Sequence, residues 1–269
     1  MNHIRVGAQI HPQHGSYEGL RRAATETEDL GYDVIYNWDH FYPLYGDPDG
    51  SHFECWTMLA AWAEQTERIE IGPLVTCNSY RNPDLLADMA RTVDHISNGR
   101  AVLGIGAGWF ERDYDEYGYE FGTVKTRLPA MRANLPRIKA RLGKLNPPPV
   151  RPLPILIAGT GPRVTLRAVA EYGDRWHAAF PRHAEDLEPA IDALKRWCGE
   201  IGRNPEEILW SVGVQPNDLD RFLSAEASTL VEMGFTEFTL GFDGPQWSVG
   251  DGRDWLAWRD EQNSGSAAD

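Results

Sequence analysis

The stretch Leu30-Gly31-Tyr32-Asp33-Val34-Ile35-Tyr36-Asn37-Trp38-Asp39-His40-Phe41 decides how this chain folds. Its apolar run follows a glycine and is typical of a buried strand in a parallel sheet. Asp39 and His40 come directly after the run, and the carboxyl ends of parallel strands are where α/β proteins bind ligands. Burying a carboxylate beside an imidazole is costly unless the two groups pair or are used. The stretch therefore predicts a parallel sheet with a functional site at one strand end.

Short apolar runs alternate with longer amphipathic stretches along the whole chain, which is the pattern of repeated strand–helix units. We expect strands at 4–10, 34–38, 69–76, 101–105, 155–158, 174–178, 208–214 and 235–240, and helices at 17–30, 53–65, 83–97, 125–142, 163–172, 184–201, 219–233 and 253–260. This strict alternation predicts a single (β/α)8 TIM barrel over residues 1–262, followed by a flexible tail over residues 263–269. The competing doubly wound sheet needs a reversal of strand order, which a sequence does not show.

Composition and charge narrow the class of protein. The net charge of −14 argues against nucleic-acid or membrane partners, because both need a basic footprint. Cys55, Cys77 and Cys198 are widely spaced and fit neither a disulfide framework nor a zinc site. No apolar run approaches the ~20 residues that span a bilayer. We therefore expect a soluble cytoplasmic protein that acts on a small molecule.

Residues that follow the predicted strands gather at one end of the barrel. They are rich in aromatic, small and hydrogen-bonding side chains and poor in charge clusters, which suits a planar organic cofactor better than a metal, and we expect no metal site. The glutamates and aspartates at 64, 67, 70, 113, 115 and 116 are interpreted as solvated surface. The residues at the strand ends are Gln9, His11, Asp39, His40, Thr76, Cys77, Asn78, Gly106, Ala107, Gly108, Trp109, Gly159, Thr160, Gly161, Trp176, His177, Gln215 and Asp243.

Two glycine-rich turns are candidate phosphate sites. Gly159-Thr160-Gly161-Pro162-Arg163 follows a strand and opens a helix, so its free backbone amides and the helix dipole could hold a phosphate. A plain tight turn that needs glycine for its dihedral angles explains the same residues equally well. Gly104-x-Gly106-x-Gly108 is a weaker signal, because it lacks the third glycine of a dinucleotide fingerprint at the right spacing.

His40 and Trp109 are the side chains most open to a functional interpretation. A buried imidazole satisfied by Asp39 would explain His40 without function, but its place at a strand end favours a role in the site. Trp109 follows a Gly-Ala-Gly turn and is expected to contact a ligand, whereas the tryptophans at 38, 56, 62 and 176 are expected in packing.

In order and spacing, these residues resemble the bacterial luciferase-like superfamily, and within it the coenzyme F420-dependent oxidoreductases. The resemblance covers nearly the full length. The matching segments are residues 30–33 running into Asp39-His40-Phe41, then Val75-Thr76-Cys77-Asn78-Ser79-Tyr80-Arg81-Asn82-Pro83, Ser97-Asn98-Gly99-Arg100, Leu103-Gly104-Ile105-Gly106-Ala107-Gly108-Trp109 and Gly159-Thr160-Gly161-Pro162.

The resemblance implies a luciferase-like barrel with abbreviated insertions and a deazaflavin across its mouth. It places His40 beside the reactive carbon, a non-prolyl cis peptide at Leu74–Val75 against the ring, and the phosphate at the turn 159–161. Ala107, Gly108 and Trp109 would approach the pyrimidine edge. The cofactor-binding residues that it implies are Asp39, Leu74, Val75, Thr76, Cys77, Ala107, Gly108, Trp109, Ala158, Gly159, Thr160 and Gly161.

The expected reaction is hydride transfer between C5 of coenzyme F420 and a small organic substrate, with His40 as acid–base catalyst and Tyr42, Glu54 and Cys77 as candidate substrate-side groups. Sugar-phosphate dehydrogenases of this family carry Glu where this chain has Trp109 and Trp where it has Leu44, which argues against a glucose-6-phosphate reaction. The alternatives are an FMN-dependent monooxygenase, a non-catalytic F420- or flavin-binding barrel and a metal-dependent barrel enzyme. Relatives commonly form homodimers through the helices that follow the second and third strands.

Overall fold

The computed structural model describes residues 3–265. Its strands are β1 (Arg5–Ile10), β2 (Val34–Asn37), β3 (Glu70–Pro73), β4 (Thr76–Cys77), β5 (Leu103–Gly106), β6 (Ile155–Ala158), β7 (Arg175–Ala178), β8 (Leu209–Val214) and β9 (Glu237–Phe242). Its α-helices are α1 (Tyr17–Asp29), α2 (Cys55–Gln65), α3 (Pro83–Ile96), α4 (Glu111–Tyr117), α5 (Val124–Leu142), α6 (Thr165–Tyr172), α7 (Glu188–Ile201), α8 (Leu219–Ala225), α9 (Ala227–Met233) and α10 (Arg253–Gly265). Across this part of the chain, no helix combines the length and apolar character needed to cross a membrane.

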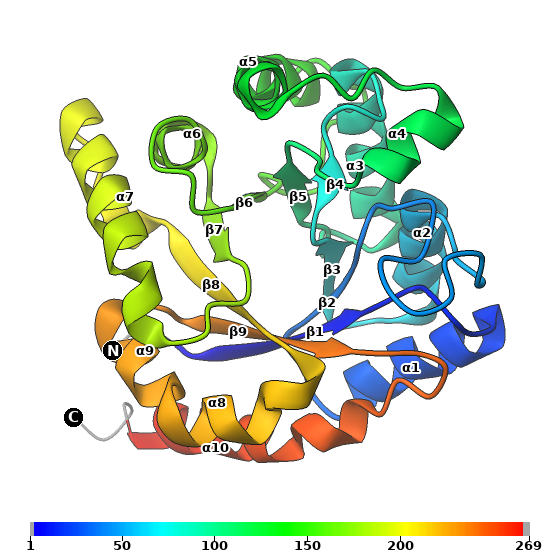
Figure 1. The fold of residues 1–269 in the computed structure, drawn as a ribbon, viewed down its shortest axis with the longest axis vertical. Coiled ribbons are helices and arrows are strands. Elements are labelled where there is room, and N and C mark those ends of the chain that lie inside the picture. Colours follow the sequence, from blue (N-terminus) through cyan, green and yellow to red (C-terminus); the bar gives the residue numbers. More distant parts are fainter. Residues whose placement is uncertain (1–2, 266–269) are drawn as a thin grey trace.

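The strands form a parallel barrel with the helices outside it (Figure 1). Their order is β3-β2-β1-β9-β8-β7-β6-β5-β4, and every pairing between neighbours is parallel. A bridge between Ile71 and Ala101 closes the ring from β3 to the segment that leads into β5. Strands β3 and β4 are consecutive parts of a single barrel strand, which is interrupted at Leu74 and Val75. The predicted (β/α)8 barrel is therefore confirmed.

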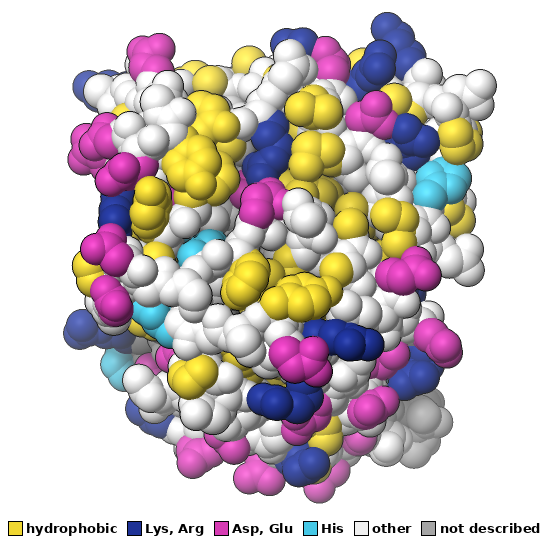
Figure 2. Space-filling model, turned by 90° about the vertical axis from the view of Figure 1, so that its right-hand side faces the viewer, with side chains coloured by type: hydrophobic (Ala, Val, Ile, Leu, Met, Phe, Trp, Pro, Cys, Tyr) yellow, Lys and Arg dark blue, Asp and Glu magenta, His cyan; other side chains and the backbone are white. Residues whose placement is uncertain are grey.

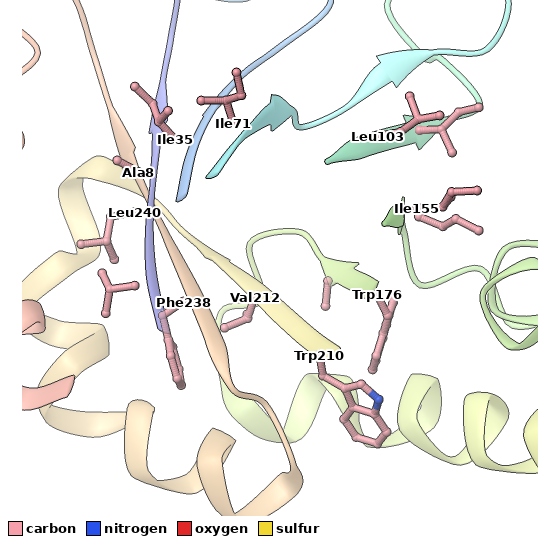
Figure 3. Packing of buried hydrophobic residues seen from close by; sticks show 14 of the residues in the cluster. Ala8, Ile35, Ile71, Leu103, Ile155, Trp176, Trp210, Val212, Phe238 and Leu240 are labelled. Carbon is pink, nitrogen blue, oxygen red and sulfur yellow. The ribbon is translucent and has the colours of Figure 1, made fainter. Parts of the chain in front are cut away.

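Alternation along the strands creates two apolar layers. Outward-facing residues such as Ile35, Trp176 and Phe238 pack against the helices in one large cluster, part of which Figure 3 shows. Inward-facing residues Val34, Tyr36, Leu74, Val102 and Leu156 form a second, smaller cluster inside the barrel. This period-two division is what a strand buried on both faces requires. It leaves the carboxyl ends of the strands free to carry a site.

Charged residues close the amino-terminal end of the barrel. Glu237 is fully buried and accepts a hydrogen bond from Arg5 Nε at 3.0 Å, while Arg175 Nη2 lies 2.8 Å from Glu70. Tyr36 Oη also donates to Glu237. The prediction that Glu70 is solvated surface is wrong, because Arg5, Arg151 and Arg175 all pair with it. Burial raises the pKa of Glu70, but these guanidinium groups outweigh burial and hold it below its ordinary value.

Local signals in the sequence set several helix ends. Asn82 caps α3 by accepting from the Asp84 amide, and Pro83 occupies the first turn. Asn98 and Gly99 both have positive φ (55° and 85°) and end the helical segment before β5, as predicted.

Three segments differ from the sequence prediction. Helix α4 was not expected. The predicted helix over 219–233 is two helices that meet at Glu226, whose carboxylate accepts from the Ala184 amide at 2.8 Å and pairs with His183. Helix α10 continues to Gly265, and Asn263 exchanges hydrogen bonds with the backbone of Ile4, so residues 263–265 do not belong to the predicted tail. The rest of that tail, 266–269, lies outside the described residues.

Candidate active site

A cavity of about 560 Å³ opens at the carboxyl ends of the strands. In Figure 1 the arrowheads of β1 and β9 point toward the side that Figure 2 shows, and hydrophobic side chains gather around the centre of that face. The predicted site residues that line the cavity are Asp39, His40, Leu74, Val75, Thr76, Cys77, Ala107, Gly108, Trp109, Ala158 and Gly159. Thr160 and Gly161, also predicted, do not line it and follow directly in the turn after β6. The structure therefore brings together residues from the ends of β2, β5 and β6, from β4 and from the break between β3 and β4.

His40 pairs with Asp113 rather than with Asp39. Its Nδ1 lies 2.7 Å from Asp113 Oδ2, and the fully buried carboxylate also accepts from Tyr80 Oη and from the amides of Phe41 and Tyr42. A carboxylate that only accepts requires the proton on Nδ1, which leaves Nε2 as the unprotonated nitrogen of neutral His40. The pair is therefore an oriented acid–base group at the cavity wall.

Asp113 is the functional residue that the sequence analysis missed. It was expected on the solvated surface because the segment Glu111-Arg112-Asp113-Tyr114-Asp115-Glu116-Tyr117 is nearly all polar and shows no apolar period. In the structure this segment is α4, which buries Asp113 against the loop after β2 and Tyr114 against Cys77 and Tyr80. The available signals were two acidic residues in the first turn and Gly118, whose φ of 69° ends the helix.

Asp39 is satisfied by the protein itself. Its carboxylate accepts from Thr76 Oγ1 at 2.6 Å, from the Cys77 amide at 2.9 Å and from both terminal nitrogens of Arg81. Burial lowers the pKa of Arg81, but the Asp39 charge outweighs burial and raises it above its ordinary value. Arg81 also bonds Glu54, which caps α2 through the amides of Trp56 and Thr57. Asp39 thus joins β2 to β4 and fixes the wall of the cavity.

The peptide bond between Leu74 and Val75 is cis, as the resemblance predicted. Gln9 Nε2 donates to the Leu74 carbonyl at 2.8 Å, and the Leu74 amide donates to Asn37. Leu74 and Val75 both line the cavity, at the break between β3 and β4.

The glycines of β5 are explained by close packing against this break. A methyl group added at Gly104 would lie 2.0 Å from the Pro73 carbonyl oxygen, and one at Gly106 would lie 2.7 Å from Val75. The Gly104-x-Gly106-x-Gly108 pattern therefore reflects close packing against the neighbouring backbone and side chains and not a dinucleotide fingerprint.

The turn after β6 exposes backbone donors at the cavity edge. Gly159 has a φ of 120°, its amide donates to the His177 carbonyl, and its carbonyl accepts from Trp176 Nε1. Among the described residues, no group accepts from the amides of Thr160 and Gly161. Helix α6 begins at Thr165, two residues later than expected, without a side-chain cap. The turn has the donors that an anion needs, and a methyl group at Gly161 would come 3.0 Å from Thr165 Oγ1.

Two further histidines line the cavity. His177 is buried with its Nδ1 2.9 Å from Ser211 Oγ, and burial lowers its pKa to about 4, so it is neutral at neutral pH. His11 lies at the end of β1, with Nδ1 2.6 Å from Asp243 Oδ1. Both were placed at strand ends from the sequence, but neither was expected to bind cofactor or act in catalysis. Trp176, also placed at the rim, instead packs outside the barrel at 5.4 Å from both Trp210 and Phe235.

The cavity is apolar and contains no free cation. Of the described residues that line it, none is Lys or Arg, and Asp39 is the one acidic residue. Trp109 is 62% exposed and meets His40 edge to face at 5.7 Å between ring centroids. Tyr45 and Phe180 are further exposed aromatic residues at the mouth. The space around the oriented imidazole therefore suits a neutral, largely apolar molecule.

The chain is similar in sequence to a known protein family and to several enzymes. The model of the luciferase-like monooxygenase family matches residues 2–217. An F420-dependent glucose-6-phosphate dehydrogenase from Amycolatopsis mediterranei (strain U-32) is 28% identical over 76% of this chain and 68% of its own. A phthiodiolone/phenolphthiodiolone dimycocerosates ketoreductase from Mycobacterium sp. (strain JLS) is 30% identical over 64% of this chain, which spans about half (52%) of that relative's length.

A solved structure shares the fold. An F420-dependent secondary alcohol dehydrogenase in complex with an F420-acetone adduct superposes with a TM-score of 0.77 at 16% identity, over 89% of this chain and 93% of the other. The chain belongs to the luciferase-like monooxygenase family.

Proposed function

We propose that this protein is a coenzyme F420-dependent oxidoreductase that transfers a hydride between the deazaflavin C5 and a neutral, largely apolar organic substrate. The observation that carries the proposal is the His40–Asp113 pair, an oriented imidazole at the wall of a largely apolar cavity. The similarity to an F420-dependent dehydrogenase supports the choice of cofactor.

The residues present fit such a cofactor. Gly106 and Gly108 let Val75 and Tyr114 pack closely against this part of the wall, where a side chain would collide with them. Val75 and both glycines line the cavity beside the cis peptide, where a planar ring would lie. The amides of Thr160 and Gly161 would hold the phosphate, as the resemblance implies. A bound 5-deazaflavin supplies the hydride chemistry, and the protein supplies orientation, a dry cavity and a proton.

His40 would give or take the proton on the substrate. Asp113 holds Nδ1, so the proton moves at Nε2, and the imidazolium that forms is stabilised by the buried carboxylate. The rings of Trp109 and Phe110 contact His40 edge to face at 5.7 and 5.6 Å and limit the access of water. Asp39 has no free proton-accepting role, because Arg81, Thr76 and Cys77 occupy it.

The cavity lining favours a neutral substrate over a sugar phosphate. A substrate phosphate needs cationic or multiple amide donors, and the lining offers no Lys or Arg while Leu44 and Trp109 both face the cavity. Ketones, enones, imines, nitro compounds and secondary alcohols are the classes to screen. We expect turnover of neutral members, followed by the deazaflavin absorbance, and none of hexose 6-phosphates; turnover of hexose 6-phosphates alone would contradict the proposed substrate class.

An FMN-dependent monooxygenase is the second candidate, because the matching family model is described as luciferase-like monooxygenase. The amides of residues 160 and 161 would hold an FMN phosphate equally well. Consumption of oxygen in step with substrate loss would support this candidate. Binding of F420 without any turnover would instead indicate a non-catalytic barrel.

We also propose a cytoplasmic homodimer, formed through the faces of α2 and α3. Leu85 and Ile96 on α3 are 54% and 39% exposed. Trp56, Met58 and Trp62 on α2 are buried in the core of the same chain and are not available to a partner. Light scattering should therefore give twice the mass of one chain, and Leu85→Glu should reduce it to one.

A further inference from the structure

A second imidazole–carboxylate pair lies in the cavity, apart from His40. His11 Nδ1 lies 2.6 Å from both Asp243 Oδ1 and Tyr45 Oη, and the Tyr45 hydroxyl donates to the same Asp243 oxygen. Burial raises the pKa of Asp243, but the hydrogen bonds from His11 and Tyr45 outweigh burial and lower it. Asp243 therefore accepts at neutral pH, and the proton of neutral His11 is on Nδ1.

Trp38 connects the two histidines. The His11 ring stacks on the Trp38 indole at 4.3 Å between centroids, and His40 meets the same indole edge to face at 6.0 Å. All three side chains line the cavity. A ligand that contacts Trp38 therefore lies close to both imidazoles.

The second nitrogen of His11 has no partner. His11 is 3% exposed, and its Nε2 makes no hydrogen bond with any described residue. A buried polar atom without a hydrogen-bond partner is costly, so such an atom calls for an explanation. Gly241 lies against this edge of the ring, and a methyl group added there would come 3.3 Å from Nε2 and 3.0 Å from Pro216, so a side chain at this position would crowd the imidazole.

We propose that His11, oriented by Asp243 and Tyr45, binds a second oxygen function of the substrate, a hydroxyl group that donates to Nε2. The inference rests on the proposed function for the reaction at His40 and adds the substrate class: an apolar diol or hydroxyketone, with one oxygen at each imidazole. An unprotonated nitrogen accepts, so a hydroxyl fits this subsite and a lone carbonyl does not.

The test uses the cofactor-free protein and two probes, trans-cyclohexane-1,2-diol and cyclohexanol, which differ by one hydroxyl. Each is titrated while the ring nitrogens of the histidines are followed by ¹⁵N NMR. We expect the diol to shift the His11 Nε2 signal saturably and to bind about tenfold more tightly than cyclohexanol, the factor expected of one hydrogen bond. The signals of His95 and His183, which do not line the cavity, serve as internal controls.

Variants separate this subsite from general damage to the fold. Tyr45→Phe removes one hydroxyl from a 45% exposed side chain, and Asp243→Ala removes the acceptor that fixes the tautomer. Asp243→Ala should abolish the preference for the diol. Tyr45→Phe, which leaves Asp243 on Nδ1, should retain it, as should Asp254→Ala, a change at an exposed acidic residue on α10. Equal affinity for the two probes, a His11 signal that the diol does not move, or a preference that survives in Asp243→Ala would overturn the inference. None of these readouts requires turnover, so failure of the proposed reaction is detected separately, by the absence of hydride transfer with F420.

Discussion

At the scale of single residues, His40 and Asp113 define the proposed chemistry. The imidazole comes from the end of β2 and the carboxylate from α4, 73 positions later in the chain. The place of His40 after a strand was enough to identify it from the sequence, but the only side-chain partner considered for it there was Asp39. Both residues lie in the loop after β2, where Asp39 contacts Thr76, Cys77 and Arg81 while His40 contacts Asp113. No local pattern could show that Asp113 comes to His40, because the contact depends on how α4 packs.

His40→Gln tests the proton-transfer role directly. Glutamine keeps a side chain of similar reach and can still donate to Asp113, but it cannot exchange a proton. We expect kcat to fall by roughly 100- to 10,000-fold, the usual contribution of general acid–base catalysis, with the F420 dissociation constant nearly unchanged. His95→Gln, at an exposed imidazole that bonds only the Pro148 carbonyl, is the matched control. Equal losses of turnover and cofactor affinity in His40→Gln would show that His40 binds the cofactor instead.

At the scale of secondary-structure elements, the regular strands and long helices were predictable and the short insertions were not. Periodicity located the strands of the barrel because both faces of each strand are buried. Helix α4 was not predicted because its seven mostly polar residues carry no periodic signal. The first turn of the next helix, α5, likewise has no apolar stripe, and Thr123 and Thr126 cap it reciprocally. The break between α8 and α9 was not predicted because it depends on contacts of the Glu226 carboxylate with Ala184 and His183, which are distant in the sequence.

Gly108 should be the glycine that holds α4 in place. It has a φ of 78°, and an added methyl group would lie 2.0 Å from Tyr114 Oη and 2.6 Å from Cys77 Sγ. Gly108→Ala should destabilise the protein by about 1–2 kcal/mol for the left-handed backbone and a further ~1–3 kcal/mol for overpacking. Chemical denaturation measures the sum.

Gly118→Ala is the matched control. Its φ is 69°, but nothing lies within 4 Å of the added methyl group, so only the backbone cost applies. If both variants lose the same stability, packing of α4 against Gly108 does not matter and the account of this element is wrong.

At the scale of the whole molecule, the two ends of the barrel divide stability from function. The amino-terminal end is closed by the buried cluster of Arg5, Glu70, Arg175 and Glu237, while the carboxyl end holds the cavity. The sequence predicted this barrel and most of the residues around its mouth because strand ends converge in any parallel barrel. It did not predict which of them contact one another, since that depends on loop conformation.

Stability should fall as the pH drops from about 6.5 to about 4. His177 has a folded pKa of about 4, because burial disfavours its charged form, whereas in the unfolded chain it titrates near its ordinary value of about 6.5. The unfolded state therefore binds more protons in this window, and stability is lost as pH falls, by up to about 3 kcal/mol. Burial also lowers the pKa of His52 to about 4, so His52 likewise makes stability fall as the pH drops.

His177→Gln isolates this contribution. Denaturation midpoints measured across this pH range should fall less steeply in the variant than in the natural protein. Parallel curves for the two proteins would show that the buried imidazole does not control acid stability.

The central claim is that this barrel binds a 5-deazaflavin and uses it. The most direct measurement is a fluorescence titration of the cofactor-free protein with coenzyme F420 and, side by side, with FMN. We predict saturable binding of F420 at low concentrations and much weaker binding of FMN. Tight binding of FMN alone would contradict the claim and favour the monooxygenase candidate, and binding of neither cofactor would remove the proposed function while leaving the barrel and its family unchanged.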